Sequence, residues 1–330
     1  MNEPVQETPY ERRTAAVIVN PVSHNVPQRR RLDEAHEWMK SQGWTITWRE
    51  TGGPDDAKRF AEDAAAQRVE LVIACGGDGT VNGVANGLIG SESALGTIPA
   101  GMSSIWAREI GVPKKPIEAV QAQVFGERRL MDTGRADKRH FVLFLGYGID
   151  AAVIQAVPDT AKDRLGAASY VIPAARKALS WKPRPIAVRI DGVQRMMDVL
   201  MAVVGNTRLY AGITKITPTA IADDGLLDVC IYSGRGKRDI LVHALRTLLQ
   251  RHRQSPKVVY RHSRRIEFDW KEPLPAQMDG EALADCPREV VVAPQSLWVA
   301  TPTTLPTSMF SRPAISRPAR QPTLPQSRTG

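Results

Sequence analysis

The first stretch whose residue types could do chemistry is Gly76-Gly77-Asp78-Gly79-Thr80, directly after the apolar run Leu71–Cys75. Glycines permit positive φ and let a ligand approach bare backbone. A helix that starts here would present unpaired N–H groups and its positive dipole end to a phosphate, and Thr80 or Asp78 could cap it. The pattern predicts an anion-binding turn between a strand and a helix; a tight turn that binds nothing is the alternative.

A second candidate is the pair of carboxylates at Asp279 and Glu281, two residues apart in the stretch MDGEA. In an extended segment side chains at this spacing share a face. A general base needs a carboxylate whose pKa is raised by burial or by a neighbouring carboxylate, and this pair could provide one. A polar turn that joins two strands is the alternative.

The glycine turn differs from two better-known phosphate loops. GxxxxGK[ST] occurs nowhere in the chain, which excludes a Walker A loop, and the third glycine is misplaced for a dinucleotide fingerprint. The stretch 146–151 does fit G-x-G-x-x-A after a strand. It lies where we expect antiparallel strands and no βαβ unit, so we expect no nicotinamide site there.

The stretch GGDGTVNGVANGL, followed by LGTIPAGMSSIWAREIGVP, resembles the catalytic domain of the diacylglycerol kinase and sphingosine kinase superfamily. GGDGT alone is less specific, because NAD kinases and phosphofructokinases also use such a turn. The resemblance spans residues 14–300 and implies an ATP-dependent kinase that phosphorylates a hydroxyl of diacylglycerol or of a sphingoid-type lipid. Further ordered matches are VNPVSH, the Thr51–Ala57 stretch, MDTGRAD with FVLFLGYGIDAAV, PTAIADDGLLDV and QMDGEAL.

The resemblance implies roles for single residues that match the family's motifs. Glu281 matches the general base that takes the proton from the lipid hydroxyl, and the glycine turn is expected to bind the ATP phosphates. Asp78 would hold Mg²⁺ through water against those phosphates, with capping of its own helix as the alternative. The positions expected to bind ATP are Asn20, Thr51, Gly76, Gly77, Asp78, Gly79, Thr80, Val81, Asn82 and Met102.

The resemblance also implies metal ligands outside the glycine turn. Asp132 matches an acid of the water–metal network near the phosphates, with a surface residue at a strand end as the alternative. PTAIADDGLLDV matches a structural Mg²⁺ turn, in which the Asp224 carboxylate and the backbone carbonyls of Ile221 and Leu226 would be ligands. Few charged ligands plus waters suit Mg²⁺. An ordinary β-turn with Asp-Gly is the alternative.

Three positions depart from the family's pattern near the nucleotide. Met102 stands in place of a threonine, Ser104 in place of an asparagine, and Ile105 where some bacterial diacylglycerol kinases have a catalytic aspartate. Two further interpretations therefore stay open. One is an inactive relative that holds nucleotide or lipid as a sensor. The other is a kinase of a soluble substrate, similar to NAD kinase, although the stretch that follows GGDGT in NAD kinases is missing.

The elements that must position these residues alternate in the first third of the chain. Apolar runs predict strands at 15–20, 44–50, 71–75 and 95–100, and helical spacing predicts helices at 29–41, 54–67, 80–88, 103–110 and 116–125. Such repetition indicates a parallel sheet covered on both faces.

After about residue 128 short strand-like runs dominate, with one main helix at 239–252. We therefore expect an α/β protein with two domains. Residues 1–130 would form a parallel-sheet ATP-binding domain similar to NAD kinase and phosphofructokinase, and residues 131–300 a mostly antiparallel β-sandwich. The stretch 301–330 is rich in Pro, Ser, Thr and Arg and has no acid, so we expect it to be disordered.

Composition narrows the partners and the compartment. The net charge of +9 favours phosphates, nucleic acid or an anionic membrane, but no aromatic–basic interleaving supports nucleic acid. The N-terminal residues lack an apolar signal segment, and the three cysteines lie far apart without CxxC spacing, so we expect a cytoplasmic protein. It would contact the inner membrane face peripherally, through basic residues at 251–265 and the mixed stretch 162–181. A homodimer stays open.

Overall fold

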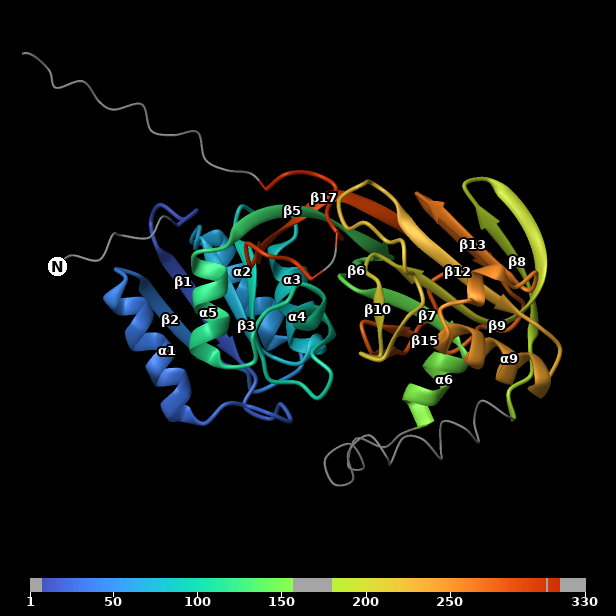
Figure 1. Ribbon diagram of the computed structural model, residues 1–330, viewed down its shortest axis with the longest axis horizontal. Helices are drawn as coiled ribbons and strands as arrows, with labels where there is room; N and C mark the ends of the chain where they lie inside the picture. Colours follow the sequence, from blue (N-terminus) through green and yellow to red (C-terminus); the bar gives the residue numbers. More distant parts are fainter. Residues whose placement is uncertain (1–7, 157–179, 307, 315–330) are drawn as a thin grey trace, which may run out of the picture.

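The computed structural model describes residues 8–156, 180–306 and 308–314 and shows two lobes side by side (Figure 1). The N-terminal lobe is built on a parallel sheet with the strand order β2-β1-β3-β4. β3 is buried along its whole length, which explains its continuous apolar run. The strands are β1 (Thr14–Val19), β2 (Thr45–Glu50), β3 (Leu71–Gly76) and β4 (Ala94–Pro99).

Helices cover both faces of this sheet, α1 with α5 on one and α2 with α3 on the other. All five predicted helices are present, which confirms the α/β character of the first lobe. α3 begins two residues before its predicted start, so Asp78 and Gly79 lie in its first turn. The helices are α1 (Arg29–Ser41), α2 (Asp56–Ala66), α3 (Asp78–Leu88), α4 (Ile105–Glu109) and α5 (Pro116–Val124).

The second lobe is a largely antiparallel β structure with its own apolar core, as predicted. Among the described residues its helices are α6 (Ile149–Ala156), α9 (Lys237–Leu248) and the short 3-10 helix η1 (His252–Gln254). Its strands are β7 (Phe144–Gly148), β8 (Arg184–Ile190), β9 (Val193–Gly205), β10 (Leu209–Tyr210), β11 (Thr214–Lys215), β12 (Leu227–Ser233), β13 (Val258–Ser263), β14 (Arg265–Asp269), β15 (Ala276–Met278) and β16 (Glu281–Leu283).

Two long strands join the lobes. β5 (Glu127–Ala136) and β17 (Glu289–Thr301) pair antiparallel with each other, and the C-terminal end of β17 also pairs parallel with β4. The short strand β6 (Arg139–Phe141) turns back along β5. The chain therefore crosses between the lobes twice, and the domain boundary predicted at residue 130 falls inside β5. The stretch 146–151, which fits G-x-G-x-x-A, joins β7 to α6. β7 pairs antiparallel with both of its neighbours, so it is not the first strand of a parallel βαβ unit.

The described part of the tail is folded onto both lobes. Met309 is fully buried and its carbonyl accepts the Ala222 N–H at 2.7 Å. Asp223 accepts the backbone N–H groups of Ser311 and Arg312 at 2.7 and 2.8 Å. The prediction of disorder from residue 301 is therefore wrong for residues 301–306 and 308–314. The polar composition of the tail gave no sign that Met309 would be buried or that Asp223, more than 80 residues away in the sequence, would bind the Ser311 N–H.

No helix in the described part of the chain is long and apolar enough to cross a membrane. Cys75, Cys230 and Cys286 are free thiols, the first two buried, as their spacing suggested. Of the mixed stretch 162–181, only residues 180 and 181 belong to the described residues.

Candidate functional site

The glycine turn packs closely against its neighbours, most tightly at Gly76. Gly77 is the N-cap of α3, in an extended conformation, and Gly76, Gly77 and Gly79 all avoid positive φ. A Cβ on Gly76 would collide with the Thr80 side chain, and one on Gly79 would collide with the Glu281 carboxylate. The need for glycine predicted here is real, but its reason is close approach and not a left-handed backbone.

A cleft of about 440 Å³ opens at this turn, between the two lobes. Five of the predicted nucleotide-binding residues line it, together with the predicted base Glu281. The first lobe also contributes Gly53, Pro54, Asp55, Ala57, Lys58, Gly83 and Asn86, and the β5–β6 turn contributes Lys138 and Arg139. The predicted residues on its wall are Asn20, Thr51, Gly79, Thr80 and Asn82.

Parallel strand ends bring the first-lobe residues together. The Asn20 amide follows β1 and donates to the Thr80 hydroxyl at 3.2 Å, while its backbone N–H donates to the Cys75 carbonyl at the end of β3. The Thr51 N–H donates to the Val19 carbonyl at 2.9 Å. Ligands bind at the carboxyl edge of such sheets, and the start of α3 adds N–H groups suited to an anion.

Asp78 caps a helix, but not its own. Its two carboxylate oxygens accept the backbone N–H groups of Ile105 and Trp106, each at 3.0 Å, at the start of α4. Burial raises the pKa of this carboxyl, and the two N–H donors oppose that shift. The contact fixes the 101–104 loop beside the glycine turn, where Gly101 touches Gly77. Each oxygen keeps a lone pair, so contact with a hydrated Mg²⁺ is compatible with this geometry.

Asp279 and Glu281 point in opposite directions, so the prediction that they share a face is wrong. Asp279 and Gly280 both have positive φ and form a two-residue turn between β15 and β16, in which Met278 pairs with Glu281. Such turns reverse the strand within two residues. The Asp279 carboxylate is buried, whereas the Glu281 side chain is 54% exposed and faces the cleft, 3.8 Å from Arg139.

Asp279 holds the two lobes in register at the cleft. Its oxygens accept the N–H groups of Val142, Leu143 and Phe144 at 2.8–2.9 Å, and the Asn82 amide of α3 at 2.8 Å. Burial raises the pKa of Asp279 to about 6 in spite of these donors. The same Asn82 amide also donates to the His140 carbonyl. Asn82 therefore lines the cleft and joins α3 to the second lobe.

Asp132 lies away from the cleft. It is fully buried, and its carboxylate accepts the N–H groups of Gly225 at 2.6 Å and Gln295 at 2.7 Å. Burial raises its pKa, and those two bonds oppose the shift. Asp132 supports the 221–226 turn and is not among the residues that line the cleft, and its expected role near the phosphates stays a prediction.

The 221–226 turn can be tested as a Mg²⁺ site on its donor atoms. Asp224 Oδ1 accepts the Leu226 N–H at 3.0 Å, and Gly225 has a φ of +79°. Burial, followed by the charges of Asp228 and Asp132, raises the pKa of Asp224. No group of three His, Cys, Asp or Glu side chains suited to a metal occurs within the described ranges. The turn thus offers one carboxylate in a negative environment, which fits a cation held mainly by carbonyls and water.

Several predicted residues do not line the cleft. Four of them belong to the end of β3 and the first turns of α3 and do not reach the wall: Gly76, Gly77, Asp78 and Val81. Met102 lies on the neighbouring loop and is 42% exposed. Sequence reasoning missed Lys58, Lys138 and Arg139, which bring positive charge to the wall. The signal for the last two was the basic pair in ADKRH, directly after the matched MDTGR passage.

Comparison with known proteins agrees with this architecture. Residues 14–136 match the diacylglycerol kinase catalytic domain, and residues 144–301 match the YegS C-terminal NAD kinase beta sandwich-like domain. The chain is 31% identical to a "Probable lipid kinase YegS-like" of Klebsiella pneumoniae (strain 342), over 88% of this chain and 96% of that protein. It is 26% identical to a "Diacylglycerol kinase" of Bacillus subtilis (strain 168), over 87% and 96%.

A solved structure shows the same fold. It is a diacylglycerol kinase from Bacillus anthracis str. Sterne, with a TM-score of 0.68 and 20% identity over 88% of this chain and 97% of that one. The two domain matches together span both lobes, including the glycine turn and the Glu281 hairpin. The chain therefore belongs to the family of diacylglycerol kinase-like lipid kinases that join a diacylglycerol kinase catalytic domain to a YegS-type C-terminal domain.

Proposed function

We propose that this protein transfers the γ-phosphate of ATP to the hydroxyl group of a lipid, with diacylglycerol or a sphingoid-type alcohol as the acceptor. The observation that carries the proposal is the position of Glu281. Its carboxylate lies directly against Gly79, in the first turn of α3, although the two residues are 202 positions apart in the sequence. The name of the Bacillus subtilis relative favours diacylglycerol as the acceptor.

The wall of the cleft supports phosphate binding. The N–H groups at the start of α3 and the side chains of Lys58, Lys138 and Arg139 provide donors and positive charge for the phosphates. Mg²⁺ bound with ATP would neutralise phosphate charge, and Asp78, within the turn, is a carboxylate that could hold it through water. Asp78 also fixes the 101–104 loop through α4, so its substitution disturbs the turn in two ways.

Glu281 supplies the base. Its exposed carboxylate accepts the proton of the lipid hydroxyl, and the hydroxyl oxygen attacks the γ-phosphorus in line. The bond between the γ-phosphorus and the β–γ bridging oxygen breaks, and ADP leaves. Arg139, 3.8 Å from Glu281, lies beside the carboxylate on the wall of the cleft.

The test is phosphorylation of a lipid extract with γ-labelled ATP and Mg²⁺ by the wild type, by Glu281→Gln and by Glu272→Gln. Glu272 is an exposed glutamate in the same lobe and serves as the matched control. We expect Glu281→Gln to lower the rate about 10²–10⁴-fold and the control to keep it. A fully active Glu281→Gln protein would refute the base. ATP binding without any labelled lipid from the wild type would favour a nucleotide sensor instead.

A further inference from the structure

Helix α9 has polar residues on its buried side and apolar residues on its exposed side. Its buried positions carry His243 and Thr247, while its leucines face solvent. The exposed apolar residues follow helical spacing on one side: Leu241 is 60% exposed, Leu245 59% and Leu248 62%, and Leu249, which follows directly, is 57% exposed. A surface helix normally turns its apolar side to the core. In α9 that side has no partner in the described part of the chain.

Polar contacts explain why the inner side of α9 needs no leucine. The His243 ring contacts the Ser233 carbonyl through Nε2 at 2.9 Å, and the Thr247 hydroxyl lies 3.0 Å from the Tyr232 hydroxyl. The Tyr232 and His243 rings also pack edge to face, with centroids 5.2 Å apart. The helix is thus anchored to β12 by hydrogen bonds, and within the described residues nothing covers its apolar stripe.

The charge around the stripe is almost entirely positive. Lys237 and Arg238 begin the helix, and Arg246 and Arg251 lie near its end, and none of the four has a carboxylate within 4.0 Å among the described residues. The one acid of α9, Asp239, is bonded to Lys257 at 2.6 Å. An apolar stripe between two groups of unpaired cations fits an anionic bilayer surface.

The β10–β11 hairpin extends the stripe. Thr214 donates to the Thr247 carbonyl at 3.1 Å, and the Gln250 amide donates to Thr214 at 2.8 Å, so the hairpin is fixed beside the end of α9. Ile213, in the loop of the hairpin, is 79% exposed. We define the docking face as Leu241, Leu245, Leu248, Leu249 and Ile213.

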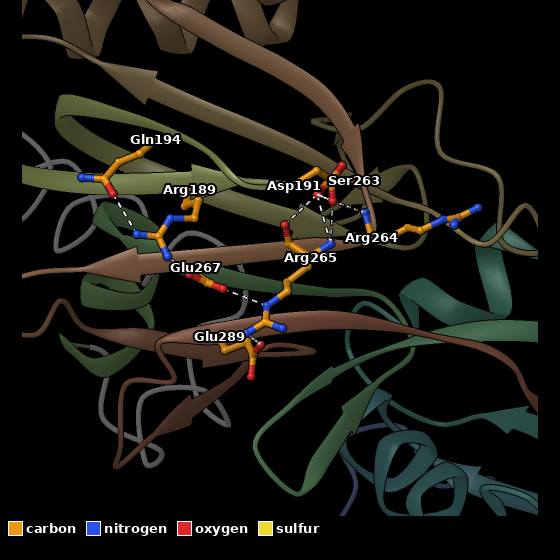
Figure 2. A network of polar contacts seen from close by, with 8 residues as sticks. All are labelled: Arg189, Asp191, Gln194, Ser263, Arg264, Arg265, Glu267 and Glu289. Carbon is orange, nitrogen blue, oxygen red and sulfur yellow. Dashed lines mark hydrogen bonds and ion pairs between the residues drawn. The ribbon is translucent and has the colours of Figure 1, made fainter.

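The basic stretch at 251–265 is a weaker candidate than its sequence suggested. Figure 2 shows Arg265 between Glu267 and Glu289, at 2.8 and 2.6 Å, in a network that also holds Arg189. Lys257 is paired with Asp239, and Arg253 lies over the Tyr260 ring. Carboxylates thus neutralise part of this stretch, whereas none of the four cations that flank the docking face, Arg251 included, has such a partner among the described residues.

We propose that the docking face seats the protein on an anionic bilayer, a proposal that rests on the lipid kinase function for its purpose but not for its evidence. A second copy of the chain fits the face less well, because two such faces would bring only positive flanks together.

Hydrogen bonds also connect the β10–β11 hairpin to the turn that precedes Glu281. The Tyr210 hydroxyl donates to Asp150, the Gln277 amide donates to Asp150, and the Gly280 N–H donates to Gln277.

This chain of hydrogen bonds runs from the hairpin beside α9 to the turn that carries Glu281. In the view of Figure 1, α6, which begins with Ile149 and Asp150, and α9 both lie along the lower side of the second lobe. A bilayer at the docking face would therefore contact a hairpin that hydrogen bonds connect to the turn before Glu281.

The experiment is sedimentation of the full-length protein with vesicles of phosphatidylcholine alone or mixed with phosphatidylglycerol, without ATP. The test variant is Leu245→Gln with Leu249→Gln. The matched control is Val193→Gln with Met196→Gln, which removes two apolar residues that are 63% and 67% exposed on β9. We expect the α9 variant to bind mixed vesicles about tenfold or more weakly, and the control to bind like the wild type.

A charge variant tests the other half of the proposal. Lys237→Gln with Arg251→Gln should lose about tenfold in affinity for mixed vesicles and little for phosphatidylcholine alone. Unchanged vesicle binding by the α9 leucine variant would overturn the proposal. So would a wild-type dimer that becomes a monomer in that variant without loss of vesicle binding, because the face would then be occupied by a second copy.

Two readouts keep this proposal separate from the proposed function. The leucine variant should keep wild-type phosphorylation of a short-chain acceptor dissolved in water, since α9 lies outside the cleft. Glu281→Gln should bind vesicles like the wild type and fail to phosphorylate. Loss of the short-chain activity in the leucine variant, with an unchanged melting temperature, would contradict a pure docking role.

Discussion

Two turns of this protein carry neighbouring acids, and they divide the work in the same way. In the β15–β16 turn, Asp279 is buried among backbone donors and Glu281 opens to the cleft. In the 221–226 turn, Asp223 is buried and binds the tail, and Asp224 is half-exposed. In each turn the buried acid accepts backbone N–H groups and so fixes the turn, and the turn then positions the more exposed acid.

The difference between the turns lies in what the buried acid joins. Asp279 receives donors from the 142–144 backbone and from α3, so it joins the two lobes at the cleft. Asp223 receives donors from Ser311 and Arg312, so it joins the second lobe to the C-terminal segment. The first contact positions groups that face the cleft, whereas the second supports a turn outside it. Substitutions should therefore separate the two turns by activity as well as by stability.

The largest stability effect should come from Asp279→Asn. The variant replaces an acceptor by an amide that faces N–H donors, so several buried donors lose a partner. We expect a loss of about 3 kcal/mol or more in the free energy of unfolding near neutral pH, with lower activity because the Glu281 turn moves. Urea unfolding measures it. A variant as stable as the wild type would show that these bonds contribute little.

The difference in the free energy of unfolding between the wild type and Asp279→Asn should also depend on pH. Because the folded pKa of Asp279 is about 6 and its ordinary value is 3.8, protonation favours the folded state. This contribution is present below about pH 4 and is lost as the pH rises through about 6. The advantage of the wild type over Asp279→Asn should therefore shrink by about 3 kcal/mol between about pH 4 and about pH 7. An advantage that grows with pH would mean a lowered pKa.

Asp223→Ala should have a smaller effect. It removes the acceptor of three hydrogen bonds, from the Ser311 N–H, the Ser311 hydroxyl and the Arg312 N–H. We expect a loss of about 2 kcal/mol in the free energy of unfolding, faster hydrogen exchange at both N–H groups, and phosphorylation within about twofold of the wild type. Ser311→Ala removes only the hydroxyl bond and should cost about 1 kcal/mol. Equal losses in the two variants would mean that the backbone bonds are dispensable.

The sequence predicted a turn at 221–226, offered the turn at 279–280 only as the alternative to an extended segment, and did not give the direction of the side chains in either. The position of the glycine turn between β3 and α3 followed from local patterns, namely an apolar run, small residues and a helix start. Asp78 and Asp279, by contrast, choose donors that come from other elements, α4 in one case and the 142–144 backbone in the other. Tertiary packing decides which N–H groups lie beside these carboxylates. A local sequence pattern could therefore suggest that Asp78 caps a helix, but it could not identify the helix.

The boundary between the lobes shows the same limit. A change from helix–strand alternation to short strands placed it near residue 130, yet β5 and β17 run through that point as continuous strands. β17 completes the first sheet only after the whole second lobe has been formed along the chain. A pairing between residues 94 and 298 leaves no local trace in the sequence. The tail was missed for a related reason, since one buried methionine does not change its polar composition.

Asp224→Asn should give the smallest effect and the sharpest test of the second turn. Asparagine keeps an oxygen that can accept the Leu226 N–H, so the turn itself should lose less than about 1 kcal/mol. If the turn binds Mg²⁺, as the family resemblance implies, millimolar Mg²⁺ should raise the melting temperature of the wild type by about 2 °C and leave that of the variant unchanged. Asp285→Asn, at an exposed position, should respond to Mg²⁺ like the wild type. The same response in Asp224→Asn would place any cation elsewhere and leave the turn as an ordinary Asp-Gly turn.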